Sequence, residues 1–314
     1  MAHLMHDTSP STIDRSQLAT ERRLAASNSL DTMTPRQIVD VMNEQDRLAQ
    51  QAVEAIAADV ADVAERVTTA LIDGKRLLYI GAGTSGRLGV LDASECPPTF
   101  RSDPSQVVGI IAGGKEAMFV AQEGAEDQPA GGAKAMDQAK VSGGDVVVGI
   151  AAGGTTPYVH GALAEAKRRG ATTVFLTCVA ASPGDPPASD VDVFLRAVVG
   201  PEVLTGSTRL KAGTATKLVL NQITTAAMVG LGKCYENLMV DLKASNAKLI
   251  DRGQRILREV LGVDTTEASR LLEAAGGHVK VAIVMGRRGV DRDTAVKLLE
   301  ASAGRLSDVL RQSP

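Results

Sequence analysis

The chain has 314 residues, of which 44% are hydrophobic, so it can bury the core of one large α/β domain plus an appendage, or of two ordinary domains. Aromatic residues make up only 2% and tryptophan is absent, which argues against the stacking platforms of single-strand nucleic-acid binders. The net charge of -3 argues against the basic surface of a duplex-binding protein. We therefore expect a small-molecule ligand and no nucleic-acid partner.

The cysteines Cys96, Cys178 and Cys234 are widely spaced and odd in number, which indicates neither a disulfide framework nor a C-x-x-C metal site. The 4 histidines form no ligand cluster, so we expect no metal. No segment approaches the roughly 18 apolar residues of a membrane span, and the N-terminus lacks the pattern of a secretory signal. These features favour a reducing cytoplasm and no membrane partner.

Residues 1–33 are polar and rich in serine and threonine, and we expect a mostly flexible leader there. A helix start is predicted at Thr34-Pro-Arg-Gln37, because Thr34 can cap, proline suits the first helical position and Gln37 completes a capping box. Apolar residues then recur at helical spacing. They predict two helices, or one broken helix, that end near Gly74.

Five short apolar segments follow, alternating with amphipathic ones. The alternation predicts strands of a parallel sheet that is covered by helices on both faces, with ligands bound beyond the carboxyl ends of the strands. We assign residues 34–244 to this domain. The predicted strands are Arg76–Ile80, Gln106–Ala112, Asp145–Ala152, Ala171–Thr177 and Val191–Leu195.

Three loops at the predicted carboxyl ends are rich in Gly, Ser and Thr, namely Gly81–Gly86, Gly153–Pro157 and Thr205–Arg209. Glycine allows unusual backbone torsions, and amides at a helix N-terminus attract phosphate. Any single loop could be an ordinary turn or cap. Three such loops at one sheet edge favour a binding site for a phosphorylated ligand.

The first loop, Gly81-Ala-Gly-Thr-Ser-Gly86, contains the G-x-G-x-x-G spacing of dinucleotide-binding folds. Those folds place an acidic residue about 20 positions later, after the second strand, to bind the ribose. Here the second strand ends in Ile111-Ala-Gly-Gly114, and Asp103 lies before it. No phosphate loop of the G-x-x-x-x-G-K-[ST] type occurs either, so the pattern favours a sugar phosphate.

Two carboxylates follow the first loop. Glu95 lies next to Cys96-Pro-Pro98, and we expect these prolines to end the helix and hold Glu95 near the sheet edge. Glu126 lies within Glu123–Asp127, after the second strand. Two carboxylates in one pocket could divide acid and base work, although their spacing alone fits solvated surface residues better.

Two other residues are weaker candidates for chemistry. A nucleophilic role for Cys96 is disfavoured, because the neighbouring carboxylate opposes formation of its thiolate. His160 lies in the helical segment after the third strand, where it could act as an acid or base. We expect a surface or packing role for it instead.

Residues 245–314 form a predicted helical module with an internal repeat, in which Gly262-Val-Asp264 recurs as Gly289-Val-Asp291. Asp264 and Glu267 have the spacing of a capping pair, so each copy predicts a capped helix. Two short helices could form a DNA-reading helix-turn-helix, but the missing basic surface favours a packing or dimerisation module.

The segment Ile80–Thr99 resembles the signature of the N-acetylmuramic acid 6-phosphate etherases. This family belongs to the sugar isomerase (SIS) domain superfamily, as do the glucokinase regulatory proteins. Further blocks that resemble the family are Glu123–Asp127, Gly200–Thr214 and Asn237–Asp241. The resemblance implies an α/β fold, a SIS three-layer sandwich with a five-stranded parallel sheet and a C-terminal helical module.

The resemblance also implies a lyase without a cofactor, which cleaves the ether between D-lactate and C3 of N-acetylmuramic acid 6-phosphate in cell-wall recycling. It implies that Glu95 protonates the leaving oxygen and that Glu126 is the base. A homodimer is implied because SIS domains commonly pair around their sites. A non-catalytic phosphosugar-sensing regulator and a phosphosugar isomerase remain as alternatives.

Two positions depart from the family pattern. Gly153-Gly-Thr155 replaces a common Ser-Gly, so no serine contact carries over, and Arg22-Arg-Leu24 lacks a common asparagine. The loops and the resemblance together assign substrate binding to Gly83, Thr84, Ser85, Gly86, Arg87, Gly154, Thr155, Thr156, Ser207, Thr208 and Lys211.

Overall fold

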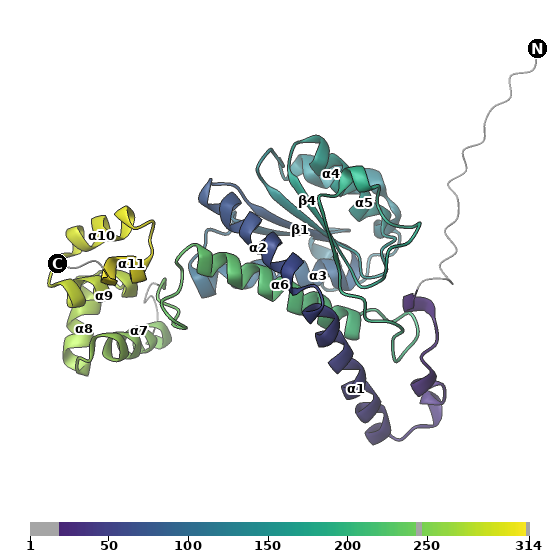
Figure 1. Cartoon of the computed structure of the whole chain (residues 1–314), viewed down its shortest axis with the longest axis horizontal. Coiled ribbons are helices and arrows are strands. Elements are labelled where there is room, and N and C mark those ends of the chain that lie inside the picture. The colour runs from purple at the N-terminus through teal and green to yellow at the C-terminus, as the bar shows by residue number, and fades with distance from the viewer. Residues whose placement is uncertain (1–18, 243–246, 312–314) are drawn as a thin grey trace, which may run out of the picture.

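A five-stranded parallel sheet forms the centre of the computed structural model, which describes residues 19–242 and 247–311 (Figure 1). The strand order is β2-β1-β3-β4-β5. Each predicted strand is confirmed, with its ends displaced by two residues at most. The strands are β1 (Leu77–Gly81), β2 (Val107–Ile111), β3 (Val146–Ile150), β4 (Thr172–Thr177) and β5 (Val193–Arg196).

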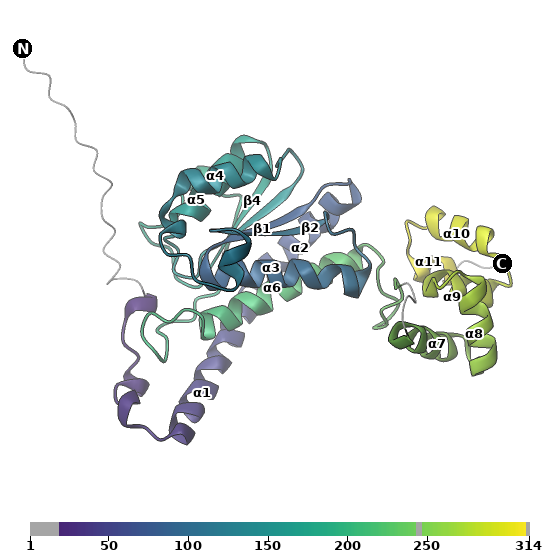
Figure 2. The same cartoon turned by 180° about the vertical axis from the view of Figure 1, so that it is seen from behind.

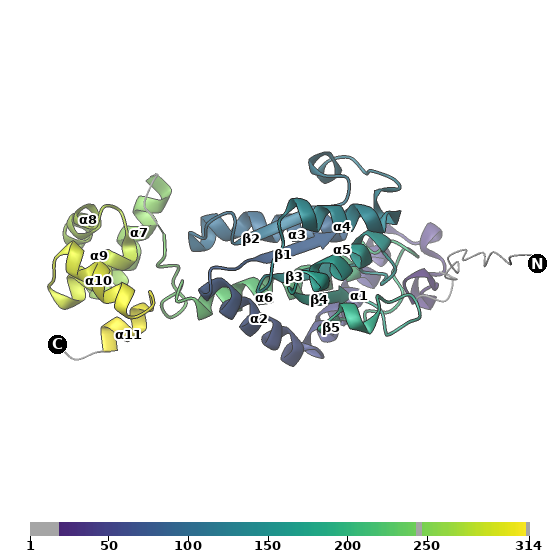
Figure 3. The ribbon, with the colours of Figure 1, turned by 90° about the horizontal axis from the view of Figure 1, so that it is seen from above.

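Helices cover both faces of the sheet, which is why its central strands are continuously apolar. Alternate strand residues enter two separate cores: Tyr79 packs with one layer of helices, and Leu78 with the other. The first layer contains α2 (Ala57–Ile72), α3 (Gly83–Phe100) and α6 (Lys211–Gly230), and the second contains α4 (Pro129–Gln138) and α5 (Pro157–Arg168) (Figures 2 and 3).

The N-terminal part begins with short turns rather than a long helix. The predicted capping box at Thr34 is confirmed, and it starts α1 (Pro35–Glu54), which is separate from α2. Residues 19–33 differ from the expected flexible leader, because they form three 3-10 turns and Ser27 donates a hydrogen bond of 2.8 Å to the carbonyl of Val203. Residues 1–18 lie outside the described ranges.

Helix α3 continues to Phe100, so the expected helix end at Pro97 and Pro98 is wrong. Prolines have no N–H, and two carbonyls one turn earlier therefore lose their helical partners. The last turn persists because Cys96 and Phe100 are buried in the core beneath it.

The C-terminal helices have a hydrophobic core of their own and lie beyond one end of α6 (Figure 1). The repeat is confirmed as two capped helices, since Asp264 and Asp291 each accept a hydrogen bond from the third amide of the helix that follows. These helices are α7 (Ala247–Leu261), α8 (Thr265–Ala274), α9 (Val279–Arg288), α10 (Arg292–Ala301) and α11 (Leu306–Arg311).

Within the described ranges, none of the helices has the length and apolar character needed to cross a lipid bilayer.

Glycine lets α3 lie directly on the sheet, and this contact predicts a stability difference. A Cβ atom added to Gly109 would lie 2.4 Å from the Cα atom of Val90, so we expect Gly109→Ala to lower the free energy of unfolding by about 1–3 kcal/mol. Gly143→Ala is the matched control, because its Cβ would meet nothing closer than 3.8 Å. Urea unfolding followed by circular dichroism measures both, and equal midpoints would contradict this account of the contact.

Candidate functional site

The glycine-rich turn between β1 and α3 is held by contacts that leave no room for side chains. A Cβ atom at Gly81 would lie 2.7 Å from the amide nitrogen of Gly86, and one at Gly86 would lie 2.7 Å from the carbonyl oxygen of Gly81. Gly83 has a φ of 52°, which favours glycine. Ala82 at the N-cap supplies no side-chain hydrogen bond, so the first amides of α3 are open to an anion.

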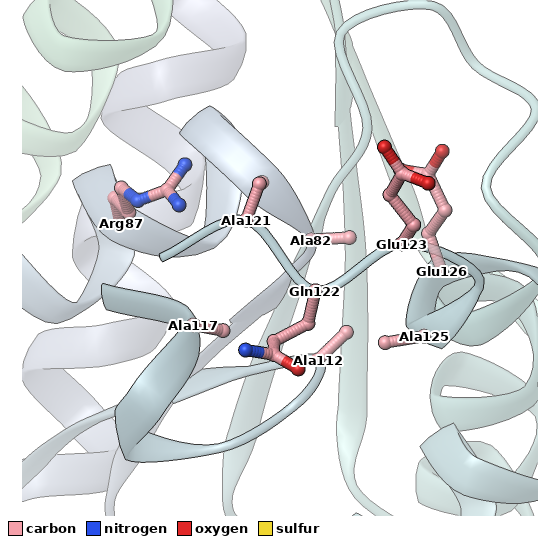
Figure 4. A pocket seen from close by; sticks show the side chains of 10 residues that line it. Ala82, Arg87, Ala112, Ala117, Ala121, Gln122, Glu123, Ala125 and Glu126 are labelled. Carbon is pink, nitrogen blue, oxygen red and sulfur yellow. The ribbon is translucent and has the colours of Figure 1, made fainter. Parts of the chain in front are cut away.

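A pocket of about 170 Å³ lies beside this turn (Figure 4). Arg87, in the first turns of α3, lines one side, and its Nε donates a hydrogen bond of 3.0 Å to the carbonyl of Met118. Glu123 and Glu126 line the other side, and their carboxyl groups project in the same direction. These acids belong to the segment that follows β2, so the loop after β1 and the segment after β2 form the pocket together.

A second pocket, of about 150 Å³, shares Glu126 with the first. Thr155 and Thr156 line it from the loop after β3, and Thr208 lines it from the loop before α6. Glu21, in the turn Ala19–Glu21, also lines it. The structure thus brings all three predicted loops to the carboxyl edge of the sheet, where Glu126 lies between them. Glu21 was not among the predicted site residues.

His160 supports the loop after β3. Its Nε2 lies 2.9 Å from the carbonyl oxygen of Gly154, and its ring packs edge-on against Phe175 with 5.8 Å between the centroids. Burial lowers the pKa of His160, which favours the neutral imidazole. Of the two expected roles, the packing role of His160 is therefore confirmed. Gly154 was predicted to bind substrate, and its carbonyl oxygen is the atom that His160 contacts.

Lys211 differs most from its predicted role. Its side chain is only 2% exposed and lines neither pocket, and its Nζ donates a hydrogen bond of 2.6 Å to Oε1 of Gln45. Burial lowers the pKa of this ammonium group. The geometry therefore gives Lys211 a buried structural contact instead of a position toward a ligand.

Glu202 is a buried acid that sequence reasoning did not single out. Its carboxylate accepts hydrogen bonds from the backbone amides of Lys211, at 3.2 Å, and Ala212, at 2.9 Å. Burial raises the pKa of Glu202, and these two amides oppose that shift. Glu202 thus occupies the N-terminus of α6, and its only sequence signal was an acid nine residues before the helix.

Three other residues predicted to bind substrate lie near the pockets without lining them. Thr84 and Ser85 are half-buried in the first turn of α3, and Ser207 is half-buried in the loop beside Thr208. None of the three lines either pocket.

Glu95 lies at the opposite edge of the sheet from Glu126. Helix α3 starts at the carboxyl edge, and its Gly89 packs on Tyr79 in the middle of β1, so the helix runs back toward the amino edge. Glu95 is exposed and lies twelve residues after Gly83, which corresponds to about 18 Å along the helix axis. The prolines were expected to hold Glu95 near the sheet edge, and the direction of α3 places it toward the amino edge, away from the three loops of its own chain.

Cys96 is unsuited to nucleophilic chemistry, as expected. Burial, with smaller contributions from the charges of Asp92 and Glu95, raises the pKa of its thiol to about 12. Over the described ranges, no group of three or more His, Cys, Asp or Glu side chains is arranged to hold a metal ion.

The comparisons with known proteins agree with this geometry. Residues 56–167 match the family model of the glucokinase regulatory protein N-terminal SIS domain. The chain is 48% identical to an N-acetylmuramic acid 6-phosphate etherase of Parasynechococcus marenigrum, over 95% of this chain and 93% of the relative. It is 51% identical to one of Klebsiella aerogenes, over 87% of this chain and 90% of the relative. The chain therefore belongs to the N-acetylmuramic acid 6-phosphate etherase family.

Proposed function

We propose that this chain is a lyase that cleaves the lactyl ether of N-acetylmuramic acid 6-phosphate, giving N-acetylglucosamine 6-phosphate and D-lactate in cell-wall recycling. The observation that carries the proposal is the similarity to etherases over both the sheet domain and the C-terminal helices. The position of Glu126 among the three ligand loops supports it. The free cysteines are consistent with the cytoplasmic location that such recycling implies.

The open N-terminus of α3 is the place we assign to the substrate phosphate. The amides of Gly83, Thr84 and Ser85 have no side-chain cap, and the helix dipole favours an anion there. Arg87 lines the adjacent pocket and adds positive charge. Binding of the phosphate would anchor the open-chain sugar, so that its reacting carbons extend toward Glu126.

The hydroxyl groups of the second pocket suit the rest of the sugar. Thr155, Thr156 and Thr208 each offer a hydroxyl that can donate or accept a hydrogen bond. We assign them to the hydroxyl groups and the amide of the open-chain substrate.

The chemistry proceeds by elimination and hydration. The C1 aldehyde acidifies the C2 proton, and the Glu126 carboxylate removes it. The electron pair of the C2–H bond is first held in the enolate of the C1 aldehyde. It then forms the C2–C3 double bond while the C3–O bond breaks, and the departing lactyl oxygen takes a proton from the acid, Glu95. Water then adds its hydroxyl to C3 and a proton to C2. A positioned acid or base typically contributes about 10²–10⁴-fold in rate.

A homodimer is part of the proposal. Glu95 and Glu126 must act on adjacent carbons of one substrate, yet they lie at opposite edges of the sheet in one chain. A second copy of the chain is the simplest source of the missing carboxylate.

A phosphosugar-sensing regulator is the second candidate, favoured by the match of residues 56–167 to the glucokinase regulatory protein domain. That match covers only part of the sheet domain, whereas the etherase similarity extends through the C-terminal helices. The two functions differ in turnover, since a regulator would bind the phosphosugar and release no lactate.

The first experiment tests the reaction itself. The purified chain is incubated with N-acetylmuramic acid 6-phosphate in deuterated water, and lactate release and deuterium at C2 are followed by NMR. We expect both, because removal of the C2 proton opens the reaction and solvent returns a proton there. Binding of the substrate without either signal would favour the regulator, and exchange at C2 without lactate release would favour an isomerase.

The second experiment separates the two acid–base roles. We expect Glu126→Gln to lose both C2 exchange and lactate release by about 10²–10⁴-fold, and Glu95→Gln to retain exchange while losing release. Glu259→Gln, an exposed change on α7, is the matched control and should keep wild-type rates. If Glu95→Gln lost exchange and Glu126→Gln kept it, the two roles would be reversed.

A further inference from the structure

The N-terminal turn Ala19–Glu21 forms part of the wall of the second pocket. Glu21 lines that pocket together with Glu126, although the two acids are distant in sequence. An ionised carboxylate can only accept hydrogen bonds, whereas the threonine hydroxyls of the same pocket both donate and accept them. Glu21 therefore gives the pocket a fixed acceptor that the threonines do not provide.

Contacts with two of the three ligand loops hold this turn in place. Thr20 is 1% exposed, and its carbonyl oxygen accepts a hydrogen bond of 3.0 Å from the amide of Gly206, in the loop before α6. Its Oγ1 atom lies 3.8 Å from the position that a Cβ atom on Gly153, in the loop after β3, would take. The turn is thus built into the carboxyl edge of the sheet domain.

The same contacts position the carboxylate of Glu21. The hydroxyl of Thr20 donates a hydrogen bond of 3.5 Å to its Oε1 atom. Its Oε2 atom would lie 3.0 Å from a Cβ atom added to Gly206, so the glycine leaves room for the carboxylate. Because Glu21 is exposed and lines the pocket, its carboxylate can still accept a hydrogen bond from a ligand.

The order of groups along the substrate decides which of them reaches Glu21. The phosphate on C6 is assigned to the first turn of α3, beside the first pocket. Glu126, which lines both pockets, is assigned to C2. The groups on the far side of C2 from the phosphate then enter the second pocket, and these groups are the C1 aldehyde and the acetamido group.

Of these two groups, only the acetamido group has a hydrogen to donate. The aldehyde and amide carbonyl oxygens are acceptors, and the hydroxyls of Thr155, Thr156 and Thr208 can donate to them. The amide N–H needs an acceptor instead. A carboxylate is the strongest acceptor that a side chain offers to it, because a charged partner strengthens the hydrogen bond.

We infer that Glu21 is a specificity-determining residue whose carboxylate accepts a hydrogen bond from the N–H of the substrate's acetamido group. The inference rests on the etherase function proposed above. It goes beyond that function by assigning recognition of the C2 substituent to the N-terminal turn.

A substrate without this N–H tests the assignment. The probe is the 2-O-acetyl analogue of N-acetylmuramic acid 6-phosphate, in which an ester oxygen replaces the amide N–H. With the natural amide, we expect Glu21→Ala to lower kcat/KM for lactate release by about 10–100-fold, the effect of losing a hydrogen bond to a charged acceptor. The loss should lie in KM, because the reaction leaves the N–H unchanged.

The two substrates and the two enzymes form a complete cycle. With the ester, Glu21→Ala should keep the kcat/KM of the wild type, since the ester has no hydrogen for Glu21 to accept. The intrinsic difference in reactivity between amide and ester cancels when the two ratios are compared. An equal loss with both substrates, or no loss with the amide, would overturn the inference.

Three further variants narrow the result to the acceptor of Glu21. Glu21→Gln keeps an uncharged acceptor oxygen, so it should retain more of the preference for the amide than Glu21→Ala does. Asp127→Asn changes a further acid that lines the second pocket, and it should keep that preference whatever its rate. Glu44→Gln, an exposed change on α1, is the matched control. If Asp127→Asn lost the preference and Glu21→Ala kept it, the assignment to Glu21 would be wrong.

Failure of this inference can be told apart from failure of the proposed function. A wild-type chain that releases no lactate from N-acetylmuramic acid 6-phosphate contradicts the function itself. An active wild type whose preference between amide and ester is unchanged by Glu21→Ala contradicts only the role of Glu21. Circular dichroism of each variant shows that the fold is intact before the rates are compared.

Discussion

Close packing of α3 on β1 and β2 is the constraint on which the site depends. Gly86, Gly89 and Gly109 lie where a Cβ atom would come within 2.8 Å of a neighbouring atom, so the helix rests almost on the backbone of the strands. This contact fixes where the helix begins and in which direction it runs. It sets the open amides of the first turn at the carboxyl edge of the sheet, and it carries the fourth turn toward the other edge.

The N-termini of α3 and α6 both lie at this carboxyl edge, and they differ in what occupies them. The N-terminus of α6 is occupied by the buried carboxylate of Glu202, which accepts hydrogen bonds from two backbone amides of that helix. The N-terminus of α3 has no side-chain cap. Since a helix start favours a negative group, Glu202 satisfies α6 from within the fold, whereas the first turn of α3 stays open to an anion. This difference supports the assignment of the substrate phosphate to the glycine turn.

The strands of the sheet could be predicted from the sequence, because strands buried on both faces are short, continuously apolar segments. The capping box at Thr34 and the aspartate caps of the C-terminal repeat were also predictable, since a cap depends on only four consecutive residues. The end of α3 was not, because burial of Phe100 outweighs a local preference of proline. Lys211 was assigned by its position in a motif, whereas its orientation depends on Gln45, which is distant in sequence.

Glu95 was assigned to the same pocket as the glycine turn because the two are close in sequence. The signature Ile80–Thr99 has a glycine turn at one end and a carboxylate at the other, and both were assigned to one pocket. On a straight helix the two ends cannot meet, because each residue adds about 1.5 Å along the axis. In the homodimer proposed as part of the function, the same helix serves two pockets: its first turn binds the substrate of its own chain, and its fourth turn supplies Glu95 to the substrate of the partner. One rigid helix would then set the geometry of both sites, so that pairing of the chains and assembly of the catalytic carboxylates are a single event.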